Sequence, residues 1–246
     1  EAMNGGWSPG QAAVDIIALS AVPLEEAIPH ARTTTHLRAV LSGGGVEVLL
    51  GRPDEKGKPG EVTVDIPPRA TWKTYAIPMM DPRFSRELEA TPLIQKDDPK
   101  LAGVARSIIG DTLKAEDAAA LINAWVHERL KKVPVMGVPS ALDVLASGQG
   151  DCNEHTTLFT ALARAVGIPT RMAAGVVYSE EIGGGPAFYY HAWPEVYLGE
   201  WVPLDPTFGQ FPADATHIKL VEGDLEDQLS MLRVVGNLQI DVRESR

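Results

Sequence analysis

The chain of 246 residues is poor in cysteine, in positive charge and in long apolar runs. Its one cysteine excludes an intrachain disulfide and any zinc or iron–sulfur site that needs several cysteines. Lys and Arg number 22 against 33 Asp and Glu, and the resulting net charge of −11 argues against a nucleic-acid partner. No apolar run approaches the roughly 20 residues that a membrane-spanning helix needs.

The beginning of the chain has no secretory leader of the usual kind, in which a charged segment precedes an apolar one. It reads Glu1-Ala2-Met3, which suggests a fragment or a processed product. We therefore expect a soluble protein, in an extracytoplasmic compartment if a leader has been removed. The sequence leaves the compartment and the oligomeric state open.

The composition is typical of a globular protein with a sizeable core, since 44% of the residues are hydrophobic and 22% are charged. Residues 1–95 are interpreted as a β-rich N-terminal segment, either a small sheet or part of a larger domain, because residues 33–78 have a strand-like pattern, although about the first 30 residues are poorly patterned. Apolar residues alternate between turns rich in glycine and proline at four predicted strands, 35–41, 46–50, 62–66 and 71–77. Residues 78–97 are interpreted as a connector because they are rich in acids and proline.

Residues 96–246 are interpreted as the catalytic domain, and their periodicity changes from helical to strand-like. Caps and apolar stripes predict helices over 99–109, 115–132, 141–147 and 152–166. Alternation then predicts strands over 171–178, 188–198 and 201–204, and an edge strand within 232–242. Helices followed by an antiparallel sheet indicate the α+β class.

Cys152 lies in the first turn of the most clearly signalled helix. Asp151 is a suitable N-cap, and Glu154 completes a capping box. A thiol at a helix N-terminus lies near unsatisfied amides and the positive end of the helix dipole, which favour the thiolate. The same amides can hydrogen-bond an oxyanion, and Gly150 would let a substrate carbonyl approach closely. Although a lone cysteine is more often a small buried hydrophobe, this position predicts a nucleophile.

His191 and Asp205 follow Cys152 in the order expected of a thiol enzyme. A base must take the proton of the thiol, and a carboxylate must hold the imidazole in the right tautomer and stabilise the imidazolium. Taken alone, His191 would be a structural residue of a half-buried strand and Asp205 a turn-former. The hypothesis of a catalytic triad therefore depends on the three residues together.

Three motif blocks carry a resemblance to a known family. They are GDCNE at 150–154 with ALARAVGIPTR at 161–171, HAWPEVY at 191–197, and WVPLDPT at 201–207. Over roughly residues 95–220 the chain resembles the bacterial and archaeal transglutaminase-like superfamily. The resemblance implies a papain-like α+β core, with Cys152 as nucleophile, His191 as general base and acid, and Asp205 as the residue that orients His191. We expect no cofactor and no metal requirement, because no acidic loop has the calcium-ligand pattern.

The hairpin between the last two motif blocks raises a geometric difficulty. A two-residue turn at Gly199-Glu200 would place Asp205 opposite Pro194, so that His191 and Asp205 would point to opposite faces of the sheet. The prolines in both strands favour a bulge or a shifted register instead. If the ladder proved regular, Glu195 would be the substitute for Asp205.

Other residues near the motif blocks are weaker candidates. Gln149 could donate to an oxyanion together with the Cys152 amide, Glu154 has the capping box as its first role, and Trp193 could wall the cleft. A zinc site from Cys152, His155 and His191 is set aside because no second tight ligand pair exists. The remaining histidines are interpreted as structural: His30, His36, His127 and His217.

The predicted chemistry is acyl transfer from a protein or peptide amide through a Cys152 thioester. Hydrolysis is favoured over transfer to an amine, because nothing in the sequence marks an amine site that excludes water. Three alternatives stay open: a protein-glutamine transamidase that cross-links proteins, an inactive binding module on the same fold, which an inert Cys152 thiol would indicate, and deglycosylation of asparagine-linked glycans. The substrate itself is not evident from the sequence.

Overall fold

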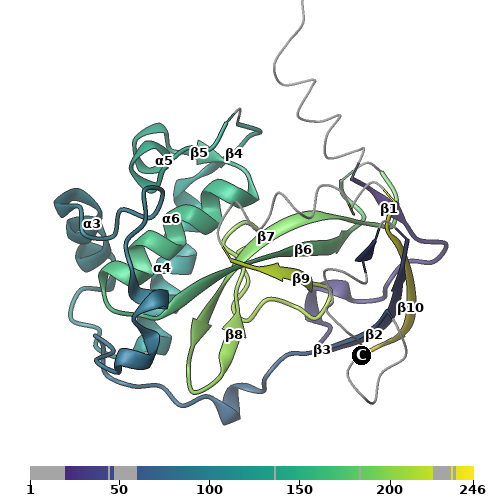
Figure 1. Ribbon diagram of the computed structural model, residues 1–246, viewed down its shortest axis with the longest axis horizontal. Coiled ribbons are helices and arrows are strands. Elements are labelled where there is room, and N and C mark those ends of the chain that lie inside the picture. Colours follow the sequence, from purple (N-terminus) through teal and green to yellow (C-terminus); the bar gives the residue numbers. More distant parts are fainter. Residues whose placement is uncertain are drawn as a thin grey trace, which may run out of the picture.

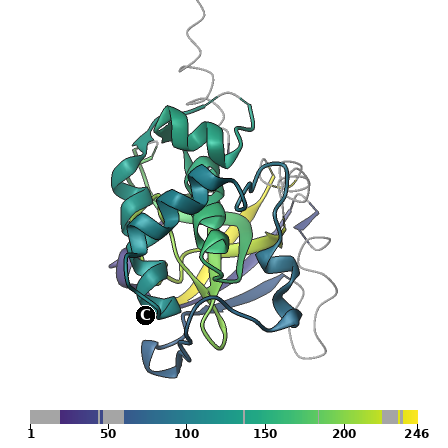
Figure 2. The same cartoon turned by 90° about the vertical axis from the view of Figure 1, so that its left-hand side faces the viewer.

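The structure is a computed structural model that describes residues 20–43, 45–46, 60–135, 137–182, 184–223, 234 and 237–246. Its helices lie on one side of a central antiparallel sheet, and a smaller sheet lies on the other side (Figure 1). Figure 2 looks onto the molecule from the helical side, with the helices in front of the strands. This arrangement confirms the predicted α+β class.

The central sheet supplies the strands that carry the second and third motif blocks. Its order is β1-β7-β6-β9, with β8 paired to β7, and all pairs are antiparallel. The strands are β1 Val22–Pro23, β6 Thr170–Ser179, β7 Ala187–Tyr197, β8 Trp201–Pro203 and β9 Ile218–Glu222. The three strands predicted between 171 and 204 are confirmed, whereas β9 was not anticipated.

The helices begin and end close to the predicted residues. They are α3 Pro99–Ile109, α4 Ala115–Arg129, α5 Ala141–Ser147 and α6 Cys152–Ala165. The prediction that the second helix runs to residue 132 is wrong. Leu130 already has an extended backbone, and the next two residues form β4 Lys131–Lys132, which pairs in parallel with β5 Gln149–Gly150. These two short strands hold the chain just before Cys152.

The smaller sheet takes strands from both ends of the chain. Its order is β10-β2-β3, and the strands are β2 His36–Ser42, β3 Glu61–Asp65 and β10 Gln239–Ser245. Two of the four N-terminal strand predictions are thereby confirmed, as is the C-terminal edge strand. The prediction for 46–50 falls almost wholly outside the described residues. The division at residue 95 stays a prediction, and β10 pairs across it with β2.

The strand predicted at 71–77 is wrong. The chain there leaves a 3-10 turn, Arg69–Thr71, and runs in extended form over the core with only an isolated bridge from Ala76 to Lys114. Its apolar side chains pack on the core between the helices and the central sheet without a partner strand: Ile77 is buried, Tyr75 packs against the core, and the Trp72 ring stacks on Phe211 at 5.2 Å between centroids. Three further 3-10 turns are Ala31–Thr33, Pro82–Phe84 and Arg86–Leu88.

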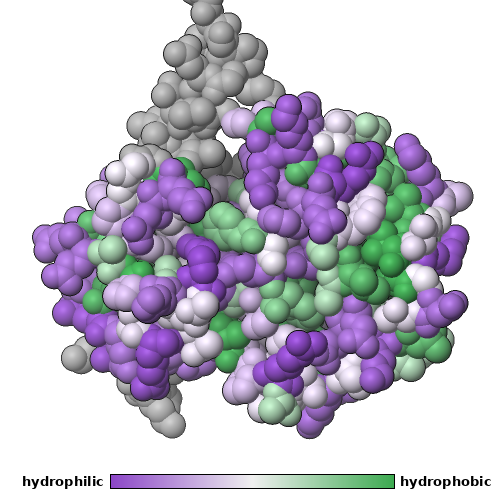
Figure 3. Space-filling view, turned by 180° about the vertical axis from the view of Figure 1, so that it is seen from behind, coloured by the Kyte–Doolittle hydropathy of each residue, from purple (hydrophilic) through white to green (hydrophobic). Residues whose placement is uncertain are grey.

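Two apolar cores hold the layers together. The first lies between the helices and the central sheet, and the second lies between the two sheets. Seen from behind, the surface is mostly polar, and apolar residues gather on its helical half (Figure 3). Four large apolar side chains of the described residues are exposed to solvent: Met80, Leu113, Leu121 and Val138. Among the described residues, no helix has both the length and the apolar character of a membrane span.

Candidate active site

Cys152 begins helix α6, and the sequence around it forms the predicted capping box. The Asp151 carboxylate accepts from the backbone amide of Asn153 at 3.0 Å, and the Glu154 carboxylate accepts from that of Asp151 at 2.8 Å. These bonds satisfy amides that a helix N-terminus otherwise leaves unpaired. The half-buried Cys152 is thereby held at the first position of a well-defined helix.

Gly150 is required here by the side chain of Glu154. A Cβ atom on Gly150 would lie 2.2 Å from the Glu154 Cβ and 2.6 Å from its Cγ, so any larger residue would displace Glu154. Glu154 is buried and folds back over the turn, as its capping role demands. Gln149 is exposed, with its backbone in β5. The oxyanion role of Gln149 and the substrate role of Gly150 stay predictions.

The Cys152 thiol contacts strand β7 at Ala192, the residue that follows His191. The backbone amide of Ala192 hydrogen-bonds the thiol, and the Thr156 hydroxyl, one turn further along α6, donates to the Ala192 carbonyl at 3.1 Å. Helix α6 is thus fixed to the strand at the residue that follows His191. The structure therefore brings together the first two motif blocks.

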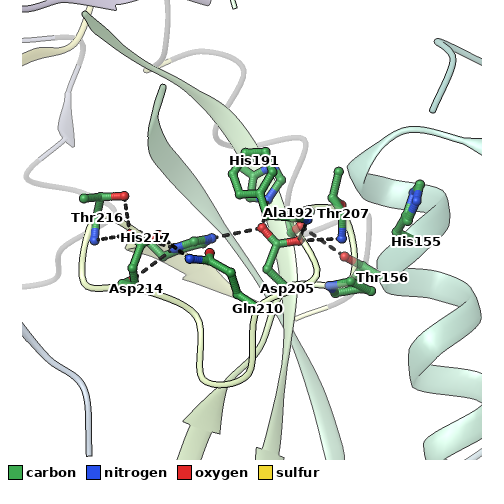
Figure 4. Close-up of polar contacts among 12 residues, drawn as sticks. His155, Thr156, His191, Ala192, Asp205, Thr207, Gln210, Asp214, Thr216 and His217 are labelled. Atoms are coloured by element: carbon green, nitrogen blue, oxygen red, sulfur yellow. Dashed lines mark hydrogen bonds and ion pairs between the residues drawn. The ribbon is translucent and has the colours of Figure 1, made fainter. Parts of the chain in front are cut away.

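His191 and Asp205 form a direct hydrogen bond in the buried interior. The His191 Nε2 donates to the Asp205 Oδ2 at 2.7 Å, and both side chains are almost fully buried (Figure 4). The Asp205 Oδ1 accepts from the backbone amides of Thr207 at 2.6 Å and Phe208 at 3.1 Å. Because the carboxylate can only accept, His191 must carry its proton on Nε2, and Nδ1 is left to accept one.

The hairpin register explains how these two residues meet. Strand β7 pairs with β8 through Glu195↔Pro203 and Tyr197↔Trp201, so three residues rather than two form the turn. The predicted two-residue turn at Gly199-Glu200 is therefore wrong, and the shifted register is correct. One extra residue in the loop moves Asp205 to the face of the sheet on which His191 lies.

Glu195, the alternative partner of His191, is engaged elsewhere. Its carboxylate accepts from the Arg171 Nε at 2.6 Å and from the Lys219 Nζ at 2.9 Å. It thus belongs to an ion-pair cluster across β6, β7 and β9. The structure brings Asp205 to His191, and not Glu195.

Aromatic rings enclose the His191 imidazole on two sides. Phe208 stacks on it with ring centroids 5.1 Å apart and an interplanar angle of 10°, and Trp193 lies 6.1 Å away at 21°. Trp193 is only 1% exposed, so it packs behind the histidine rather than lining an open surface. The two rings restrict the orientation of the imidazole.

One family model matches the part of the chain that contains the predicted site residues. Residues 102–206 match the family model of the transglutaminase-like superfamily, a segment that contains Cys152, His191 and Asp205. Residues 102–206 are therefore similar to the core of that superfamily. A search of curated proteins finds no match.

Solved structures resemble this chain at low sequence identity. A protein from Cytophaga hutchinsonii, provisionally named a cysteine protease, has a TM-score of 0.54 and 16% identity over 92% of this chain and 82% of its own. The periplasmic domain of TgpA from Pseudomonas aeruginosa has a TM-score of 0.45 and 18% identity over 80% of this chain and 92% of its own. The first likeness shows that the transglutaminase-like core has the fold of that solved protein.

His217, which the sequence suggested to be a structural histidine, lies at the candidate site. It is 3% exposed, and its Nε2 lies 3.1 Å from the same Asp205 oxygen that binds His191. Asp214, three residues earlier, holds its other ring nitrogen through the backbone carbonyl at 2.9 Å. The spacing Asp214 to His217 signals a local turn, but the meeting with Asp205 depends on the intervening loop, which no sequence pattern specifies.

His191, Asp205 and His217 also have the composition of a metal site, since their ligand atoms lie within 4.8 Å of one another. Their geometry fits hydrogen bonds better. The Nε2 atoms of His191 and His217 both lie at hydrogen-bond distance from one Asp205 carboxylate oxygen. The Nδ1 of His217 also lies at hydrogen-bond distance from an acceptor, the Asp214 carbonyl oxygen. Metal ligation requires a neutral imidazole with a free lone pair, which these partners disfavour at His217. His155 donates its Nδ1 to the Asp151 carbonyl at 2.6 Å instead of turning to a shared site.

The electrostatics at Cys152 differ from the sequence expectation. Burial raises the pKa of the Cys152 thiol well above its ordinary value, and the Asp151 carboxylate raises it further, while the Ala192 amide lowers it. The helix N-terminus alone would favour the thiolate. With Asp151 and Glu154 both close by, these surroundings favour the neutral thiol of Cys152 over a preformed thiolate.

Glu154→Gln is expected to lower the pKa of the Cys152 thiol. Burial raises the pKa of Glu154 itself, and the negative charge that Glu154 acquires as pH rises opposes ionisation of the thiol. Glutamine retains the oxygen that caps the Asp151 amide. The rate of alkylation by iodoacetamide, followed against pH by mass spectrometry, should therefore shift to lower pH.

Asp143→Asn is the matched control, because Asp143 occupies the same capping-box position in helix α5. It should leave the alkylation profile of Cys152 unchanged. An unchanged profile in Glu154→Gln as well would contradict the electrostatic account.

Proposed function

We propose that this protein hydrolyses amide bonds of protein or peptide substrates through a thioester on Cys152. The observation that carries the proposal is the buried hydrogen bond from His191 to Asp205 beside a thiol that contacts the Ala192 amide. A base oriented by a carboxylate next to a nucleophile is the arrangement that nucleophilic acyl transfer requires. The family match over residues 102–206 supports the same chemistry.

In the first half of the reaction, the Cys152 sulfur attacks the carbonyl carbon of the amide. The thiol proton passes to the His191 Nδ1, and the sulfur–carbon bond forms as the carbonyl oxygen becomes negative. The carbon–nitrogen bond then breaks, and the same proton goes to the leaving amine. Asp205 stabilises the transient imidazolium throughout, since its carboxylate faces the His191 Nε2 proton.

The oxyanion needs donors close to the sulfur. We assign this role to the backbone amide of Cys152, at the first position of α6, with the side-chain amide of Gln149 as the second donor. A helix N-terminus presents backbone amides toward such a charge, and preorganised donors of this kind supply much of the rate of acyl-transfer enzymes.

In the second half, water attacks the thioester carbonyl. His191 accepts a proton from the water, the carbon–sulfur bond breaks, and the proton returns to the Cys152 sulfur while the acid is released. We choose water over an amine because water reaches the half-buried Cys152 without a dedicated site. An amine acceptor needs a subsite that binds it and excludes water.

The proposal is tested with a casein-type substrate, with and without a labelled primary amine, beside Cys152→Ala. Mass spectrometry should detect cleavage or deamidation with the native protein and none with the variant. Label incorporation that depends on Cys152 would replace hydrolysis by transamidation. Absence of both reactions, together with slow alkylation of Cys152 at every pH, would indicate an inactive module and overturn the proposal.

A further inference from the structure

Asp205 is bound by a second histidine that the triad does not include. Its Oδ2 accepts from His191 at 2.7 Å and from His217 at 3.1 Å, and its Oδ1 accepts from two backbone amides (Figure 4). Four N–H donors therefore surround one buried carboxylate. His191 and His217 approach it from different directions, with ring centroids 5.6 Å apart and an angle of 60° between the rings.

The second ring nitrogen of His217, Nδ1, also faces acceptors. This Nδ1 lies 2.9 Å from the Asp214 carbonyl oxygen and 3.5 Å from the Asp214 Oδ1. The Asp214 carboxylate in turn accepts from the Arg32 Nη1 and the Gln210 Nε2, both at 2.9 Å, and from the Thr216 amide. Because both ring nitrogens of His217 face acceptors, the ring satisfies them only when both nitrogens carry protons.

We propose that His217 is a positioning residue of the catalytic site, which as an imidazolium fixes Asp205 and weakens its hold on the protonated His191. The inference deepens the proposed hydrolase and depends on His191 acting there as base and acid. The two carboxylates raise the pKa of His217 to about 9 against the opposing effect of burial, so that it is charged at neutral pH. Asp205 is then shared between two cations.

The consequence for catalysis is a balanced proton affinity at His191. A buried Asp205 with no other partner would stabilise the His191 imidazolium strongly and delay return of the proton to the leaving amine. The positive charge of His217 offsets part of that attraction. A unit charge at the observed ring separation changes the proton affinity of a buried imidazole by about one to two pH units.

Other charged groups near His217 are already paired. Arg171, Glu195, Lys219 and Asp65 line a cavity of about 420 Å³ that also borders His217. Arg171 and Lys219 each pair with Glu195 and Glu222, and Asp65 pairs with His36. Arg32 lies beyond Asp214. Asp205 and Asp214 therefore dominate the field at His217, and the outer charges stay the same when His217 is changed.

His217→Gln is the decisive variant, because glutamine keeps a side-chain N–H donor and removes the charge. The titrations of the histidine rings are followed by NMR in a Cys152→Ala background, where the thiol does not interfere and no substrate is needed. The His191 titration is expected to move up by about one to two pH units in His217→Gln. In the active background, the acidic limb of the kcat/KM profile for casein should move in the same direction.

His36→Gln is the matched control, since His36 also pairs with a carboxylate, Asp65, but lies in the small sheet. It should leave the His191 titration unchanged. If His217→Gln does not fold, Asp214→Asn gives the second test: His217 should then lose its proton at lower pH. Titration of native His217 at or below the ordinary histidine range would overturn the inference, as would an unchanged His191 titration in a folded His217→Gln.

The NMR titrations test the role of His217 independently of the proposed reaction. A shifted His191 titration without any cleavage that requires Cys152 would keep the positioning role and remove the hydrolase. Cleavage that requires Cys152, with an unshifted titration, would keep the hydrolase and remove the positioning role.

Discussion

Replacing Asp205 by asparagine is expected to lower the rate of the cleavage that depends on Cys152 by about 10³- to 10⁴-fold. The Asp205 Oδ1 accepts from two backbone amides, and an amide oxygen can keep those bonds. The side-chain NH₂ group would then face the two histidine Nε2 atoms. His191 would have to accept through Nε2 and carry its proton on Nδ1, where it could no longer take one from Cys152.

The same change has a second effect through His217. With the carboxylate gone, the imidazolium of His217 loses the partner that stabilises it, since Asp205 is one of the two groups that raise the pKa of His217. His217 should therefore become neutral at a lower pH in Asp205→Asn. Binding of substrate should change little, because the loss concerns the transition state, so the fall should appear in kcat.

The measurement compares kcat and KM for casein cleavage by the native protein and Asp205→Asn, with circular dichroism to verify folding. Asp65→Asn is the control, because Asp65 also accepts from a histidine, His36, but on the exposed edge of the small sheet. Its kcat should equal that of the native protein. Retention of more than a tenth of the native kcat in Asp205→Asn would contradict the assignment of Asp205.

Local features of the fold could be predicted from the sequence because neighbouring residues determine them. The capping boxes at Ser140 and at Asp151 place the starts of α5 and α6 correctly, since the cap and its partner lie three residues apart. Lys131 is a counterexample. Two lysines complement the end of a helix, but pairing of Lys131 with Gln149 in a short parallel ladder overrides that preference.

The candidate site also combines features that the local sequence predicts with contacts that depend on the fold. Cys152, His191 and Asp205 lie in motif blocks whose residue order alone suggests the chemistry. The contact between His191 and Asp205 depends on a hairpin loop of three residues. The sequence shows only that a two-residue turn would place the two side chains on opposite faces of the sheet. His217 could not be found in this way, because its link to Asp205 is made by a loop that the alternation of the strands does not describe.

The N-terminal segment also contributes to the site in a way the sequence does not reveal. Arg32 donates to Asp214, and its guanidinium lies over the Phe208 ring at 4.8 Å from the centroid. Phe208 in turn stacks on His191. Residues before the predicted boundary at 95 thus support both the carboxylate behind His217 and the ring that covers His191, which gives the segment a structural part in the site.

Gly175→Ala is expected to destabilise the protein by about 2 to 4 kcal/mol. Gly175 in β6 pairs with His191 on one side, and on the other side it lies at the register shift between β6 and β9. A Cβ atom there would lie 1.9 Å from the Ile218 carbonyl oxygen and 2.9 Å from its carbon. Backbone atoms held in a ladder cannot rotate away, so β9 would have to move as a unit.

The displacement would also reach the site, because Ile218 directly follows His217. A shift of β9 would lengthen the hydrogen bond from His217 to Asp205, so that activity should fall together with stability. Urea denaturation measures the first effect and casein cleavage the second. Gly103→Ala is the matched control: Gly103 lies inside α3 with no atom near the position of an added Cβ, and alanine should stabilise that helix by about 0.5 to 1 kcal/mol. If Gly175→Ala proved as stable as Gly103→Ala, β9 would be able to move without a cost in stability. The position of His217 would then not be fixed by the pairing of β9 with β6.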